Sequence, residues 1–244
     1  MCRSLAVLLA VFLALASLPG IAAAAPPVDL ALVLAVDVSA SVTDERYGLQ
    51  RSGFAAAFRD GAVIEAITSG ERHAIAVTLV EWSGPSSQRQ VIGWTIIDGA
   101  ASARAFGAAL EEAPRAFSDF TSISGGLDYS AMLLAASGLD AQRKVIDVSG
   151  DGANNSGRAL ADARAAAIAA GITVNGLAIL GNEPGIDEYY RDNVIGGDGA
   201  FVIVAQDYSA FSRAILNKLL REIAAILALP CPVAARGCGA GHIP

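Results

Sequence analysis

The chain has 244 residues, of which 54% are hydrophobic and 17% charged, and its formal net charge is −7. This acidic balance disfavours nucleic acids and anionic membranes as partners. The length is enough for one sizeable domain that buries its own core without help from disulfides.

The first 25 residues are typical of a secretory signal sequence. Arg3 supplies the positive start, Leu5–Leu18 the apolar stretch, and Ala22–Ala25 a small-residue cleavage zone. The apolar stretch is short for a membrane span, so we expect the mature protein to be exported, periplasmic or secreted, with no stable span. Residues 26–229 are then expected to form one domain.

Short apolar runs alternate with longer Ala-rich stretches along the whole of this domain. The pattern predicts an α/β fold of Rossmann-like, doubly wound type, with a mostly parallel central sheet and helices on both faces. The second and third strands alternate more than the others and are joined by a short turn, so they should pair antiparallel at a sheet edge. The expected strands are Leu30–Val36, Ala74–Glu81, Arg89–Ile97, Lys144–Val148, Thr173–Leu180 and Ala200–Ala205.

The Ala-rich stretches between the strands predict the helices. Thr43 is a suitable N-cap for the first of them, and Asp207 for the last. The expected helices are Asp44–Arg59, Ser102–Glu112, Gly125–Ala136, Gly157–Ala170, Asp187–Asn193 and Tyr208–Leu229.

The tail from 230 to 244 is rich in Gly and Pro and holds Cys231 and Cys238. In an exported protein we expect these two cysteines to form a disulfide that closes a small loop. Two free thiols are the alternative, and a zinc site would have only His242 as a nearby partner.

Oxygen-bearing side chains gather where predicted strands and loops end. Asp37, Ser39 and Ser41 follow the first strand at every second position, and Asp151 follows the fourth strand between two glycines. A third group, Thr121 to Ser124, precedes a predicted helix. Ligands of open parallel sheets bind beyond the carboxyl ends of the strands, so these groups can meet at one edge. An all-oxygen site of this kind suits Mg²⁺, Mn²⁺ or Ca²⁺.

These segments resemble the von Willebrand factor A (vWA) domain and its metal-ion-dependent adhesion site, whose pattern is Asp-x-Ser-x-Ser, a loop Thr, and a later Asp. The matching residues are Asp37, Ser39, Ser41, Thr121 and Asp151, in that order. The resemblance extends from residue 28 to 229, and the chain is most similar to exported single-domain bacterial members of unknown function.

The resemblance implies a binding module rather than an enzyme. Ser39, Ser41 and Thr121 would give hydroxyl oxygens to the ion, while Asp37 and Asp151 would bind it directly or through water. Two carboxylates roughly neutralise a divalent ion, which can then take an acidic side chain of a partner protein as its last ligand. Ser122 and Ser124 are competing choices for the loop ligand.

Other interpretations remain at this point. Ser39 and Ser41 would serve equally as helix caps, and Asp151 as a turn residue. The segment from Gly150 to Asn155 also resembles the acidic motif of haloacid-dehalogenase-type phosphatases, but Ser39 stands where those enzymes have a second Asp, which removes the general acid. A purely structural metal is a further alternative.

Overall fold

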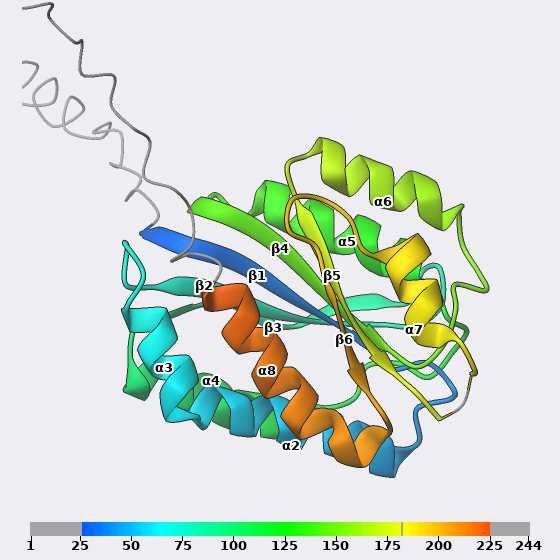
Figure 1. Ribbon diagram of the computed structural model, residues 1–244, viewed down its shortest axis with the longest axis horizontal. Helices are drawn as coiled ribbons and strands as arrows, with labels where there is room; N and C mark the ends of the chain where they lie inside the picture. Colours follow the sequence, from blue (N-terminus) through cyan, green and yellow to red (C-terminus); the bar gives the residue numbers. More distant parts are fainter. Residues whose placement is uncertain (1–25, 182, 225–244) are drawn as a thin grey trace, which may run out of the picture.

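The computed structural model describes residues 26–181 and 183–224. They form a six-stranded sheet with strand order β3-β2-β1-β4-β5-β6, covered by helices on both faces (Figure 1). All neighbouring strands pair parallel except β2 and β3. The strands are β1 (Pro27–Asp37), β2 (Ile75–Trp82), β3 (Gln88–Ile97), β4 (Asp140–Gly150), β5 (Thr173–Ile179) and β6 (Val202–Ala205). The predicted fold class and its antiparallel edge strand are confirmed.

The burial of β1 explains its sequence. Every residue from Val28 to Asp37 is buried, because β2 and β4 flank the strand and helices cover both of its faces. A parallel strand in that position has no solvent face and reads as a continuous apolar run. Edge strand β3, by contrast, is largely half-buried, and its polar and apolar residues are mixed.

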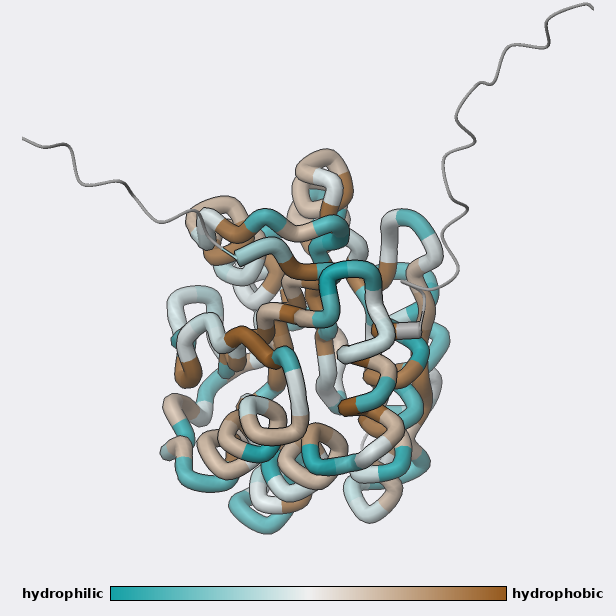
Figure 2. The backbone as a smooth tube through the Cα atoms, turned by 90° about the vertical axis from the view of Figure 1, so that its left-hand side faces the viewer, coloured by the Kyte–Doolittle hydropathy of each residue, from teal (hydrophilic) through white to brown (hydrophobic). Residues whose placement is uncertain are grey.

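Two hydrophobic cores lie on the two faces of the sheet. Leu30, Leu32 and Leu34 face one core, and the alternate residues Ala31 and Val33 face the other. Figure 2 shows the backbone from the end at which β1 starts, with the most hydrophobic stretches in the interior. The first core is covered by α2 (Asp44–Arg59), α3 (Gly61–Thr68), α4 (Ala100–Glu112) and α8 (Phe211–Ala224), and the second by α5 (Ile123–Ala136), α6 (Leu160–Ala169) and α7 (Ile186–Tyr189).

The structure differs from the expected elements in a few places. Helix α3 was not predicted; it starts after Asp60, whose carboxylate accepts a hydrogen bond from Ala62 N at 2.8 Å. The expected helix Asp187–Asn193 is split into α7 and a π-helical turn, η1 (Tyr190–Val194). The expected helix Tyr208–Leu229 starts with a short 3₁₀ turn, η2 (Tyr208–Ala210), before α8.

Some predictions fall on residues outside the described ranges. They are the signal sequence at 1–25, the end of the last helix beyond residue 224, and the Cys231–Cys238 disulfide. Among the described helices, none is long and apolar enough to cross a bilayer.

The strand order places a ligand-binding edge beside β1. The chain lays β2 and β3 on one side of β1 and then returns to add β4 on the other side. Strand order therefore reverses between β1 and β4, and the groove beyond their carboxyl ends is where open α/β sheets bind ligands.

Candidate metal centre

Two buried carboxylates meet at the carboxyl ends of β1 and β4. Asp37 is the last residue of β1, and Asp151 directly follows β4. The two strands are parallel neighbours, with Val36 opposite Ser149, so both carboxylates lie at one edge. Asp37 is fully buried and Asp151 is 2% exposed. A nearby cation would stabilise two like charges in this position.

The Asp-x-Ser-x-Ser segment connects the two carboxylates through the backbone N–H of Ser39 and the hydroxyls of Ser39 and Ser41. Ser39 N donates to Asp37 Oδ1 at 2.7 Å, which turns the chain back over the end of β1. The hydroxyls of Ser39 and Ser41 are 3.2 Å apart, and Ser41 Oγ donates to Asp151 Oδ1 at 2.7 Å. Four of the five residues selected from the sequence are thus joined in one contact chain. The serines do not cap α2, because Thr43 accepts from Arg46 N in that role.

Thr121 is held beside Asp151 by the segment that follows β4. Thr121 N donates to Asn155 Oδ1 at 3.0 Å, and Asn155 N donates to Thr121 O at 2.9 Å. A Cβ placed on Gly152 would lie 3.9 Å from Thr121 Oγ1, so the hydroxyl lies against the turn that carries Asp151.

The competing hydroxyls of Ser122 and Ser124 lie elsewhere. Both side chains are fully buried and lie under Gly157, where an added Cβ would come within 2.5 and 2.8 Å of their oxygens. Ser122 Oγ also caps α5 by accepting from Gly125 N at 3.2 Å. Their placement favours Thr121 as the loop hydroxyl of the site.

Asp37 is a buried carboxyl group that its surroundings compensate only in part. Its Oδ2 is buried and has no hydrogen-bond partner among the described residues. Burial raises the pKa of Asp37 to about 7, and the charge of Asp151 adds to the shift, although hydrogen bonds from Ser39 oppose it. A desolvated carboxylate with one oxygen unpartnered is a suitable ligand for a cation, which would supply the missing interaction.

Sequence reasoning missed the groups that hold Asp151. Tyr208 Oη donates to Asp151 Oδ2 at 2.9 Å, and burial beside this carboxylate raises the pKa of Tyr208 further above its usual range, so the phenol stays protonated. Arg46 Nη1 lies 3.5 Å from the same oxygen and donates to Ser41 O at 2.8 Å. The position of Arg46 in the first turn of α2, close to the Asp-x-Ser-x-Ser segment, was a weak sequence signal that it contacts the site. No local sequence feature indicated that Tyr208 does.

Arg115 fixes the backbone of the Asp-x-Ser-x-Ser segment from outside. Its Nη2 donates to the carbonyl oxygens of Val38, Ser39 and Val42, at 2.9, 3.2 and 2.7 Å. Its Nη1 also pairs with Asp44 at 3.2 Å. The sequence alone did not single out this arginine.

The donor set is made of oxygen only. Within the described ranges, no three His, Cys, Asp or Glu side chains gather into a metal-binding group, so hydroxyls must complete any site here. Two carboxylates and three hydroxyls, with one carboxylate oxygen unpartnered, fit a hard divalent cation such as Mg²⁺, Mn²⁺ or Ca²⁺.

Known structures share this fold. A proximal thread matrix protein from the mussel byssus, solved with a zinc-occupied MIDAS motif, has a TM-score of 0.60 at 12% identity, over 83% of this chain and 47% of that one. A von Willebrand factor type A protein from Catenulispora acidiphila has a TM-score of 0.56 at 16% identity, over 81% of this chain and 43% of that one. The pilus adhesin SpaC from Lactobacillus rhamnosus GG has a TM-score of 0.56 at 20% identity, over 81% of this chain and 30% of that one. The chain thus spans less than half the length of each.

A search of curated proteins found no match. A family model described as "Protein of unknown function (DUF1194)" matches residues 27–227, which is nearly all of the described fold. The chain therefore belongs to this family of unknown function, and its fold is that of a vWA domain.

Proposed function

We propose that this protein is an exported binding module that captures an acidic group of a partner protein through a divalent cation. Asp37, Ser39, Ser41, Thr121 and Asp151 are the proposed ligands. The observation that carries the proposal is the contact chain from Asp37 through both serines to Asp151, with one buried Asp37 oxygen left unpartnered. Export rests on the signal sequence expected at 1–25.

Each ligand has a distinct task. Asp37 and Asp151 supply the negative charge. Tyr208 holds the carboxylate of Asp151 in place, and Arg115 holds the backbone of the Asp-x-Ser-x-Ser segment. The three hydroxyls supply neutral oxygens, so a bound cation would stay electrophilic and accept an anionic oxygen from a partner. Mg²⁺ is the first candidate, with Mn²⁺ and Ca²⁺ as alternatives.

The surroundings suit a protein partner. A cavity of about 440 Å³ adjoins the ligand loops and is lined by residues that include Ser41, Thr121 and Phe120. Phe120 is 66% exposed, which is unusual for so large an apolar side chain. An exposed aromatic beside a charged centre offers apolar contact area to a partner whose carboxylate reaches the cation.

The test is calorimetric titration of the chelator-treated protein with Mg²⁺, Mn²⁺ and Ca²⁺. We expect saturable binding by the wild type and its loss in Ser39→Ala and Asp151→Asn. The exposed residues Ser52 and Asp162 supply the matched controls Ser52→Ala and Asp162→Asn, which should bind as the wild type does. Undiminished metal affinity in both site variants would refute the ligand assignment.

A structural cation is the second candidate, favoured by the unpartnered Asp37 oxygen. It would stabilise the fold without recruiting anything. Acidic peptides added to the metal-loaded protein distinguish the two: binding that disappears with chelator supports capture, whereas binding independent of the ion supports a structural role.

A further inference from the structure

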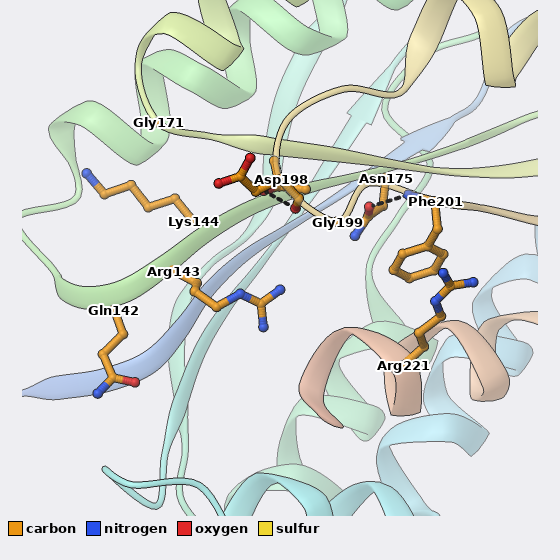
Figure 3. Close-up of a pocket in the computed structure, with 10 residues that line it drawn as sticks. Gln142, Arg143, Lys144, Gly171, Asn175, Asp198, Gly199, Phe201 and Arg221 are labelled. Atoms are coloured by element: carbon orange, nitrogen blue, oxygen red, sulfur yellow. Dashed lines mark hydrogen bonds between the residues drawn. The ribbon is translucent and has the colours of Figure 1, made fainter. Parts of the chain in front are cut away.

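A second cavity lies at the opposite end of the sheet from the proposed metal site. It has a volume of about 450 Å³ and lies between the first residues of β4 and β5, the segment 198–201 and the last turns of α8. Arg143, Asn175, Phe201 and Arg221 line it (Figure 3). We call this cavity the arginine pocket. Its volume is within the range of small-molecule binding sites.

The lining is basic although the chain is acidic. Arg143, Lys144 and Arg221 line the pocket, and among the described residues that line it Asp198 is the one acidic residue. None of the three basic residues forms an ion pair with another described residue. In Figure 3 the guanidinium groups of Arg143 and Arg221 lie on the same side of β4, whereas Lys144 points to the other side. The two arginines therefore define the recognition surface.

Arg143 is held in place by a backbone carbonyl and not by a side-chain ion pair with a described residue. Its Nη1 donates to the backbone oxygen of Glu222 at 2.9 Å. One carboxylate oxygen of Glu222, Oε1, accepts from Lys218 Nζ at 2.6 Å and from Asn175 Nδ2 at 3.0 Å. Partial burial lowers the pKa of Arg143, although the charge of Glu222 opposes the shift. A positioned, partly desolvated guanidinium is an effective partner for an anion.

Arg221 is held by stacking. Its guanidinium carbon lies 4.0 Å from the centre of the Phe201 ring. Phe201 is itself fixed, because its backbone N donates to Asn175 Oδ1 at 3.1 Å. A stacked guanidinium keeps its edge donors available, so the pocket has two arginines whose orientation is set before any ligand arrives.

We propose that the arginine pocket binds a small molecule that carries a carboxylate or phosphate group, with its oxygens between Arg143 and Arg221. Planar guanidinium groups recognise both oxyanions by paired hydrogen bonds. The remaining volume, walled by Phe201 and Gly199, would hold the body of the ligand. This site does not depend on the cation at the other end of the sheet.

The test is titration of the full chain with inorganic phosphate and with succinate at constant ionic strength. The protein is first treated with chelator, which is then removed by dialysis against metal-free buffer, so that no anion binds through a metal and no chelator competes for the pocket. We expect saturable binding of at least one anion by the wild type, weakened about tenfold or more in Arg143→Gln and in Arg221→Gln. Whichever anion binds more tightly, phosphate or succinate, identifies phosphate or carboxylate as the preferred group.

Arg104→Gln is the matched control, because Arg104 is exposed on α4 and its loss makes the same change in net charge. It should bind as the wild type does. Arg221 is exposed, so Arg221→Gln keeps the test valid if the Arg143 variant folds poorly. Absence of saturable binding by the wild type, or equal affinity in Arg104→Gln and both pocket variants, would overturn the proposal.

Discussion

At the scale of single residues, Asp37 explains most about the site. It is a charged side chain at the end of an otherwise apolar strand, fully buried, with one oxygen unpartnered among the described residues. Such a position costs stability unless a cation or a proton compensates. An acid at this position is therefore informative about function, because Asn would fill about the same volume without the charge.

This cost gives a prediction about pH. Without metal, the pKa of Asp37 is about 7 in the folded protein and close to 3.8 when unfolded. Between these values the folded state binds more protons, so this residue makes the protein less stable as pH rises from about 4 to 7. In chelator at pH 8, Asp37→Asn should raise the unfolding free energy by roughly 2–4 kcal/mol.

Urea denaturation of both proteins at pH 5 and pH 8 measures this effect. The difference between wild type and variant should be much larger at pH 8 than at pH 5. Asp162→Asn, at an exposed position, should show no such pH-dependent difference. A variant that is less stable than the wild type at pH 8 would show that the buried charge is compensated in another way.

At the scale of elements, the conformation of the Asp-x-Ser-x-Ser loop depends on a segment that is far away in the sequence. Arg115 follows α4 and reaches three backbone carbonyls of the loop after β1. The segment that carries Arg115 is itself fixed to β2, because Ala116 N donates to Glu81 Oε2 at 2.7 Å. The conformation of the Asp-x-Ser-x-Ser loop is thus set by β2 and by the segment after α4 as well as by its own sequence.

Arg115→Met should therefore weaken both stability and metal binding. It keeps most of the side-chain volume but removes the donors to Val38, Ser39 and Val42. We expect a loss of about 2–4 kcal/mol in unfolding free energy and about tenfold in metal affinity. Thermal denaturation and metal titration check the two effects, with Arg104→Met on α4 as the control. Unchanged metal affinity would show that the loop keeps its shape without this arginine.

The order of elements was accessible from the sequence because each carries a local signal. Continuous apolar runs marked the buried parallel strands, and Thr43 marked the start of α2. Helix α3 was missed because it begins directly after α2, so its cap, Asp60, looked like the end of one helix rather than the start of the next.

The sequence could predict only those residues of the site that come directly after a predicted strand. Asp37 and Asp151 could be brought together by reasoning from parallel topology. Tyr208 could not, because its hydrogen bond to Asp151 spans 57 residues and depends on where η2 sits after β6. The role of the five oxygen side chains as metal ligands stays a prediction.

At the scale of the whole molecule, metal binding should be visible as stability. A ligand that binds only the folded state stabilises it by about 2.7 kcal/mol at 100 times its dissociation constant. For a domain of this size we expect the melting temperature to rise by about 5–10 °C with saturating Mg²⁺ or Mn²⁺, and to fall again with chelator. Asp151→Asn should melt at one temperature in both conditions; an equal shift in that variant would place the ion elsewhere.

The path of the chain also determines how the protein can be attached to something else. β1 starts at Pro27, and α8 ends at Ala224, both at the end of the sheet opposite Asp37 and Asp151 (Figure 1). Attachment to a resin, a carrier or a cell surface through either end would therefore leave the proposed metal site facing outward. The same attachment would bring the anchoring surface close to the arginine pocket, which lies at that end of the sheet.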